Sequence, residues 1–164
     1  MKRLLFYTFI NMSFISRLVN DKWYMYFIVK AHKLQGVHFI GTPEYIQKDA
    51  YLDPSGGLTI YQGVVISTRV IVLTHDWSFL KRPNNQNTVE YAFKSVSIEE
   101  NSFIGAGAII LPGTRIGKHC IIGAGAVIKG FIEDYSILIG NPAKKIGDTR
   151  KSGKYLKNVN RGLN

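Results

Sequence analysis

From residue 98 to residue 133 the hydrophobic and polar positions of the chain recur every six residues. The stretch divides into IEENSF, IGAGAI, ILPGTR, IGKHCI, IGAGAV and IKGFIE, each beginning with isoleucine. A period of six fits neither the period of about 3.6 residues of a helix nor the alternation of an ordinary strand. It predicts a coil with short flat faces, in which one aliphatic side chain per face points to a common axis. The fifth position is small in five of the six segments: Ser102, Ala108, Thr114, Cys120 and Ala126.

The same phase occurs upstream in two series of aliphatic residues spaced six apart, separated by a slip at Gly56–Gly57. The series are Ile40, Ile46, Leu52 and then Ile60, Ile66, Val72. Stacked turns of such a coil pair each strand with the equivalent strand one turn away, which predicts long parallel sheets. The pattern therefore predicts a mainly β solenoid over residues 36–147.

A polar insertion interrupts this pattern after Val72, and the repeat resumes at Ile98 in a new register. The intervening HDWSFLKRPNNQNTVEYAFKS predicts a loop at about residues 75–95 that protrudes from the solenoid. Long loops in compact domains tend to carry function. His75 stands at the root of this loop, directly after an apolar run, and is therefore the first candidate for chemistry.

Residues 1–35 lack the six-residue period. Residues 3–34 predict one or two amphipathic helices, with Asn20 and Asp21 offering an N-cap for the second. No small-residue cleavage site follows the first apolar run, and no apolar stretch reaches the roughly 20 residues of a membrane span. The aromatic and basic mixture allows two interpretations: a helix packed on its own domain or a neighbouring subunit, or a helix lying among lipid headgroups.

Composition adds little to this picture except through charge. A chain of 164 residues with 46% hydrophobic residues fits one globular domain. Its single cysteine excludes an intramolecular disulfide and fits a reducing compartment. The net charge of +10 favours an anionic partner, but the basic residues are scattered and no nucleic-acid motif accompanies them, so nucleic acid is not expected. The basic tail 148–164, together with the aromatic N-terminal segment, leads to the hypothesis of peripheral contact with an anionic membrane surface.

Four stretches make the chain resemble the hexapeptide-repeat acyltransferases with a left-handed parallel β-helix. They are IGAGAIILPGTRIGKHCIIGAGAVI, ILIGNPAKKIG, LTHDW and VEYAF. Together they are similar to the sugar O-acetyltransferases of the maltose, galactoside and capsule type. The resemblance covers about residues 40–147. It implies a cytoplasmic homotrimer with active sites between subunits, acetyl-CoA as acyl donor, no metal, and a sugar or glycan-precursor acceptor in capsule or O-antigen biosynthesis.

The resemblance also implies roles for residues of the loop. His75 aligns with the general base of the family. An imidazole, whose unperturbed pKa is about 6.5, suits the removal of a hydroxyl proton at neutral pH. Glu90 falls near a glutamate that orients this base, although a solvated loop glutamate is an equal alternative, and Asp76 competes for the role. Trp77 either stacks on a substrate ring or covers the base of the loop. Arg69 replaces an asparagine that contacts the acceptor, which points to a different, conceivably anionic, sugar.

The resemblance places the acyl donor along the groove between coils, against turns of small residues. The candidate donor-binding residues are Gly105, Ala106, Ala124, Gly125, Lys129 and Lys144. A Thr-Lys pair typical of the family is absent, because Lys129 and Gly130 stand there instead. For the lysines, a solvated surface position is an equal alternative.

Three other functions remain open. N-acylation of an amino sugar needs the same donor and less help from a base. A metal enzyme of the γ-carbonic anhydrase type needs three converging histidines, whereas only His75 and His119 lie within the coil. A non-catalytic solenoid scaffold would not need the long loop after His75.

Overall fold

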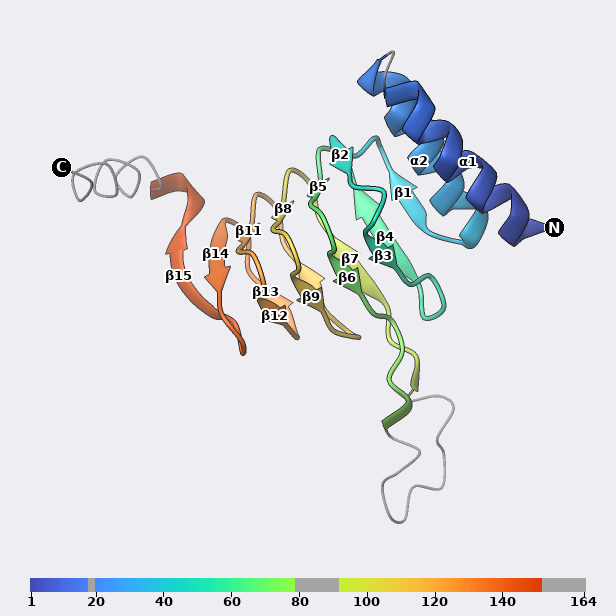
Figure 1. Cartoon of the computed structure of the whole chain (residues 1–164). Coiled ribbons are helices and arrows are strands. Elements are labelled where there is room, and N and C mark those ends of the chain that lie inside the picture. Colours follow the sequence, from blue (N-terminus) through green and yellow to red (C-terminus); the bar gives the residue numbers. More distant parts are fainter. Residues whose placement is uncertain (18–19, 79–91, 152–164) are drawn as a thin grey trace.

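The computed structural model describes residues 1–17, 20–78 and 92–151, which form a helical hairpin followed by a three-sided coil of strands (Figure 1). Helix α1 spans Lys2–Arg17 and helix α2 spans Asp21–Gln35. The Asn20 side chain accepts a hydrogen bond of 2.8 Å from the Lys22 backbone N–H, so Asn20 is the N-cap of α2. Two helices and this cap are present as the sequence pattern predicts.

Fifteen short strands occupy the described part of the chain after the hairpin and form three sheets. The first sheet contains β1 (His38–Ile40), β4 (Leu58–Tyr61), β7 (Val96–Ile98), β10 (Arg115–Ile116) and β13 (Phe131–Ile132). The second contains β2 (Tyr45–Ile46), β5 (Val65–Ile66), β8 (Phe103–Ile104), β11 (Ile121–Ile122), β14 (Ser136–Ile139) and β15 (Lys144–Asp148). The third contains β3 (Tyr51–Leu52), β6 (Ile71–Val72), β9 (Ile109–Ile110) and β12 (Val127–Ile128). All neighbours pair in parallel except β14 and β15, and a short 3₁₀ helix follows at Thr149–Lys151.

The core of the coil is a set of aliphatic stacks, one behind each sheet. In the first sheet, for example, Ile60 pairs in register with Ile98, and Ile98 with Ile116. All six isoleucines of the repeat are less than 2% exposed, and the five small residues at the fifth position are also buried. Each such isoleucine contributes on the order of 1.5–3 kcal/mol when fully buried. The six-residue pattern and the mainly β solenoid that it predicts are therefore confirmed.

The first turn of the coil departs from the predicted phase. Ile40 was expected to point inward, but it is 52% exposed. Phe39 instead pairs with the inward Ile60 and packs partly buried against the core. Seven residues rather than six separate Phe39 from the next inward residue, Ile46. The extra residue shifts β1 by one position, which reverses the face of every side chain in that strand.

The helical hairpin covers the start of the coil. Tyr24, Met25 and Ile28 of α2 are buried in the same hydrophobic cluster as the coil interior. The Tyr24 hydroxyl donates to the Ile46 carbonyl at 2.9 Å, and its ring stacks on Tyr45. Helix α1 packs on α2 and forms the outer layer of this end of the molecule (Figure 1).

The insertion between β6 and β7 leaves the coil through a short antiparallel stem. His75 and Phe93 form an isolated antiparallel bridge. On either side of it, the Asp76 backbone N–H donates to the Ala92 carbonyl at 2.7 Å, and that of Lys94 donates to the Thr74 carbonyl at 2.8 Å. The backbone that carries His75 is therefore held by hydrogen bonds on both sides. Residues 79–91, which include Glu90, lie outside the described residues.

The buried histidine of the hairpin predicts a pH-dependent stability. His32 is 2% exposed, contacts Phe6 and has no hydrogen-bond partner on either ring nitrogen among the described residues. Burial lowers the pKa of His32 to about 4. In the unfolded chain the pKa is about 6.5, so only the unfolded state takes up this proton between the two values, and the free energy of unfolding falls as the pH drops through that range. The unmodified protein should lose up to about 3 kcal/mol of unfolding free energy over this pH range. We expect denaturant titrations to show that His32→Leu removes this loss.

The exposed His38 on β1 supplies the control for this experiment. His38→Leu should leave the pH dependence of the free energy of unfolding as it is in the unmodified chain. An equal effect of both substitutions would show that burial of His32 is not the cause.

Candidate active site

A buried carboxylate from the preceding turn of the coil holds His75. Strands β3 and β6 pair in parallel with Leu52 opposite Val72, so the residues that follow them meet at one edge of the third sheet. There, Nδ1 of His75 lies 2.6 Å from Oδ2 of Asp53. Asp53 is 4% exposed, whereas the side chain of His75 is 28% exposed. A buried acid thus faces one side of a partly accessible imidazole.

Asp53 is kept ionised by hydrogen bonds to both of its oxygens. Oδ2 accepts from the Thr74 backbone N–H at 2.8 Å and from the Thr74 hydroxyl at 2.7 Å. Oδ1 accepts from the Ser55 backbone N–H at 3.0 Å and from the Ser55 hydroxyl at 2.6 Å. Burial acts to raise the pKa of the Asp53 carboxyl, but the hydrogen bonds from Ser55 and Thr74 together outweigh it and hold the pKa well below its ordinary value.

An ionised Asp53 determines the tautomer of His75. A carboxylate only accepts hydrogen bonds, so Nδ1 of the imidazole carries the proton and donates it to Asp53. In the neutral imidazole the lone pair is then on the other ring nitrogen, Nε2, which makes no hydrogen bond with any described residue. This is the arrangement of a general base whose orientation is set by a carboxylate.

A glycine under the stem completes the support of this pair. The Gly56 backbone N–H donates to the Thr74 hydroxyl at 2.8 Å. A Cβ on Gly56 would lie only 2.2 Å from the Thr74 carbonyl oxygen and 3.0 Å from the Lys94 backbone nitrogen. Only glycine allows the chain after Asp53 to pass this close to the stem.

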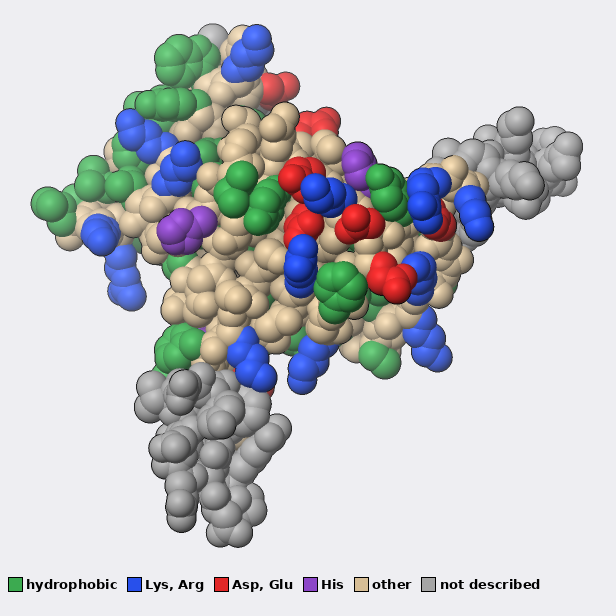
Figure 2. Space-filling view, turned by 180° about the vertical axis from the view of Figure 1, so that it is seen from behind, with side chains coloured by type: hydrophobic (Ala, Val, Ile, Leu, Met, Phe, Trp, Pro, Cys, Tyr) green, Lys and Arg blue, Asp and Glu red, His purple; other side chains and the backbone are tan. Residues whose placement is uncertain are grey.

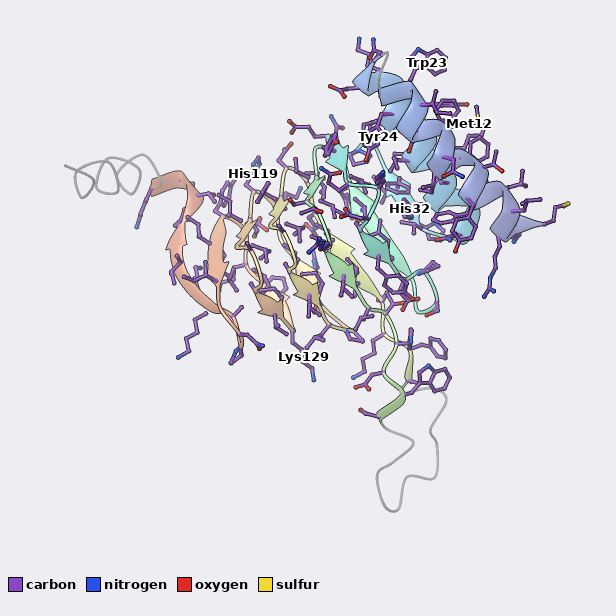
Figure 3. All side chains as sticks on the ribbon, viewed as in Figure 1. Met12, Trp23, Tyr24, His32, His119 and Lys129 are labelled. Carbon is purple, nitrogen blue, oxygen red and sulfur yellow. The ribbon has the colours of Figure 1, made fainter. Side chains whose placement is uncertain are left out.

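His75 lines a hollow of about 210 Å³ at the edge between the third and first sheets. Lys94 and Lys129 line it together with His75 and Asp76, and Leu73, Leu111 and Pro112 supply its apolar wall. Figure 3 places Lys129 at the edge from which the loop departs, and His119 at the opposite edge of the coil. The hollow therefore combines a base, two ammonium groups and an apolar surface.

Two of the predicted loop residues lie next to His75. Trp77 is 49% exposed, and its ring centroid lies 6.1 Å from that of His75 and 5.5 Å from that of Phe93. Asp76 lines the hollow and accepts a hydrogen bond from the Ser78 backbone N–H at 2.9 Å. Asp53 rather than Asp76 is the carboxylate on Nδ1 of His75.

The small residues expected to bind the acyl donor lie at a different edge, between the second and third sheets. Backbone hydrogen bonds from Gly107 to Thr68 and from Gly125 to Ala106 stack the corners there. Arg69 belongs to the same edge, because it precedes β6 whereas His75 follows that strand. Within one chain, the strands of the third sheet thus separate this corner from His75. The residues gathered along it are Arg69, Gly105, Ala106, Ala124 and Gly125.

Different constraints account for the two glycines of this corner, Gly105 and Gly125. A Cβ on Gly105 would meet the backbone of the next turn at 2.6 Å, so close stacking of the coil accounts for it. Gly125 has a φ of +67° and open space where a Cβ would stand. Gly125 and the exposed Ala124 are therefore the corner positions that a ligand can approach.

The remaining candidates do not join the hollow. Lys144 lies exposed in β15, and His119 stacks its ring on Tyr135 with centroids 5.1 Å apart. Across residues 1–17, 20–78 and 92–151, no group of three or more His, Cys, Asp or Glu side chains is placed to hold a metal ion.

Asp53 is the candidate site residue that the sequence pattern did not single out. A signal was present: Asp53 follows the inward Leu52 at the end of a predicted strand, and His75 stands shortly after Val72, the equivalent inward residue one turn later. Parallel stacking of those two strands places both residues at one edge.

Comparison with known proteins shows which repeat this is. Residues 95–130 match the family model described as bacterial transferase hexapeptide (six repeats). The repeat in this part of the coil is thus similar to that of the bacterial hexapeptide transferases. Two relatives extend this match. The chain is 48% identical to galactoside O-acetyltransferase of Lactococcus lactis over 34% of its length. It is 26% identical to a candidate lipopolysaccharide biosynthesis O-acetyl transferase of Escherichia coli over 68% of its length. These matches cover 28% and 61% of the relatives' own length, so the chain spans less than two thirds of either.

Two solved structures are similar to this chain. Maltose O-acetyltransferase of Clostridium difficile 630 is 28% identical with a TM-score of 0.50, covering 69% of this chain and 57% of that one. An N-acyltransferase of Bacillus cereus, solved in complex with dTDP and coenzyme A, is 27% identical with a TM-score of 0.50, covering 64% of this chain and 59% of that one. The relatives and neighbours of the hexapeptide coil are thus named as transferases of acyl groups.

The contact beneath the stem predicts that Gly56 is needed for stability. We expect Gly56→Ala to lower the free energy of unfolding by roughly 1–3 kcal/mol, because the backbone at Thr74 must move to admit the methyl group. Gly147→Ala is the matched control: its Cβ would lie 3.4 Å from the Ile137 side chain, an ordinary contact, and φ is not in the left-handed region. Equal changes in urea midpoints for the two variants would contradict the prediction.

Proposed function

We propose that this protein transfers an acetyl group from acetyl-CoA to a hydroxyl of a sugar. The single observation that carries the proposal is the Asp53–His75 pair, in which Asp53 holds Nδ1 of the ring beside a hollow lined by Lys94 and Lys129. The names of the galactoside, maltose and lipopolysaccharide relatives support a sugar acceptor, and the coenzyme A complex of the Bacillus cereus neighbour supports an acyl-CoA donor.

In the proposed reaction, Nε2 of His75 takes the proton of the acceptor hydroxyl while its oxygen attacks the thioester carbonyl. The carbon–sulfur bond then breaks, and the imidazolium returns the proton to the departing sulfur, which leaves as a thiol. Asp53 holds the ring by Nδ1 and stabilises the positive charge that the ring carries between these steps. A base of this kind contributes on the order of 10²–10⁴ in rate. His75 is the proposed catalytic residue and Asp53 a positioning residue.

The lysines of the hollow fit a substrate that carries negative charge. Lys94 and Lys129 are both exposed and lie on the same edge as His75. Ammonium groups serve as flexible point charges for phosphate or carboxylate. We assign Lys129 to the phosphates of the donor or of an anionic acceptor, and Trp77 to stacking on a ring of the substrate.

We propose further that the active form is a homotrimer with sites between subunits. The outward side chains of the third sheet are apolar along the coil, whereas those of the first sheet are mostly polar, as Thr59, Ser97 and Arg115 show. The hollow begins at the margin of the third sheet, since Leu73 and Leu111 line it. A partner packed on the third sheet would bring its open corner at Ala124 and Gly125 toward His75. The outward residues are Tyr51, Ile71, Ile109 and Val127.

The proposed setting is surface-polysaccharide biosynthesis in the cytoplasm, at the inner face of the membrane. The support is the name of the Escherichia coli relative, a candidate O-acetyl transferase of lipopolysaccharide biosynthesis. A capsule or O-antigen precursor that carries negative charge would suit the two lysines of the hollow.

N-acylation of an amino sugar is the second candidate, because one structural neighbour is an N-acyltransferase. The acceptors distinguish the two activities. A free amine is nucleophilic without a base, so an N-acyltransferase would keep most of its rate in His75→Ala. An O-acetyltransferase would lose most of its rate in the same variant.

The first test is the release of coenzyme A thiol from acetyl-CoA with a panel of sugars, amino sugars and nucleotide sugars. We expect His75→Ala to lower kcat about 10²–10⁴-fold, and Asp53→Asn to lower kcat with little change in KM, because the ring stays in place but loses the negative charge that stabilises its protonated form. His119→Ala is the control, since this exposed imidazole lies at another edge. Undiminished release by His75→Ala with hydroxyl acceptors would overturn the proposal.

The subunit arrangement has its own test. We expect Ile109→Glu to convert a trimer into a monomer in light scattering and to abolish acetyl transfer, because it buries a charge between subunits. Ser97→Glu is the matched control: it lies on β7 of the same turn and points outward from the first sheet. A trimer that survives Ile109→Glu would contradict packing through the third sheet.

A further inference from the structure

Helix α1 is apolar on both of its long faces. The face formed by Phe6, Phe9 and Ile10 is partly buried against α2 and the core. The opposite face carries Leu4, Leu5, Met12 and Ile15, whose spacing places them on one side of a helix. Leu4 is 73% exposed and Ile15 is 65% exposed. We call these four residues the outer stripe.

The position of the outer stripe argues against a cover from within the coil. Helix α1 is the outer layer of the hairpin, and α2 separates it from the strands (Figure 1). The coil offers other apolar surfaces to a second copy, among them the outward side chains of the third sheet. The stripe would remain uncovered in an assembly built through that sheet.

The charge around the outer stripe favours an anionic surface. Residues 1–35 contain a single acidic residue, Asp21. Figure 2 shows hydrophobic and basic side chains together over the helical end, while most acidic side chains gather over the coil. The basic residues of this segment are Lys2, Arg3, Arg17, Lys22, Lys30 and Lys33.

Aromatic residues border the same end of the molecule. Trp23 is 55% exposed, Tyr7 is 62% exposed and Tyr26 is 50% exposed. Rings of this kind are favoured at the level of lipid headgroups, where one part of the ring is apolar and the other is hydrated. No helix among the described residues is long and apolar enough to cross a bilayer.

We propose that the outer stripe of α1 binds an anionic lipid surface, with α1 lying along the headgroup region. The aliphatic side chains enter the apolar boundary, and the basic residues of the hairpin neutralise lipid phosphates. The coil and its hollow then extend away from the bilayer. This inference concerns location rather than chemistry, so it holds or fails independently of acetyl transfer.

The test is sedimentation of the full chain with phosphatidylcholine vesicles that contain or lack phosphatidylglycerol. We expect binding only where phosphatidylglycerol is present. Leu4→Ser combined with Ile15→Ser should weaken it at least about tenfold, since two exposed aliphatic side chains no longer enter the lipid. Lys2→Gln combined with Arg3→Gln should weaken it by at least about fivefold.

The control is Phe131→Ser combined with Ile146→Ser, two exposed apolar residues of the coil far along the chain from α1. It should bind within about twofold of the unmodified protein. Equal binding by the stripe variant and this control would overturn the proposal, as would equal binding to pure phosphatidylcholine. A change in molar mass of the stripe variant in light scattering would overturn it as well, by showing that a second copy covers the stripe.

Discussion

Backbone pairing between successive turns of the coil is the constraint on which the rest of the structure depends. The hydrogen bonds from Asp53 to Val72, from Leu73 to Ile110 and from Leu111 to Ile128 run in one line along the third sheet. They bring residues from four separate turns to one edge, and Lys129 ends the line. The hollow beside His75 exists because these residues share an edge, and the aliphatic stacks inside the coil keep the turns in register.

The site occupies the place where the repeat is broken twice. One break is the slip at Gly56–Gly57, and the other is the insertion after β6. Gly56 lets the first break pass under the stem of the second, so that Asp53 and Thr74 meet. A buried aspartate does not stabilise a regular coil. Here five hydrogen bonds, including the one from His75, compensate for its burial.

The helical end and the side of the coil present different features. The hairpin closes the coil with Tyr24 and Ile28, which continue the aliphatic interior, and it leaves an apolar stripe on its outer helix. The hydrogen-bonded stem that carries His75 lies on the side of the coil. A protein with this arrangement can rest one end on a surface while its site stays open to solvent. The geometry is compatible with an acceptor that is itself held near that surface.

The six-residue period alone determined the solenoid, because only a repeating turn buries one aliphatic residue in six and pairs each strand with its equivalent. The apolar run before the polar insertion likewise singled out His75 as a candidate. The phase of the first turn and the partner of His75 were decided by tertiary structure. Ile40 matches the period but lies outside, since one extra residue in the turn after β1 shifts the strand. The sequence pattern did not single out Asp53, and it did not show that the cofactor candidates are divided between two edges. A spacing along the chain specifies which residues recur, but only the stacking of turns in space specifies which of them meet.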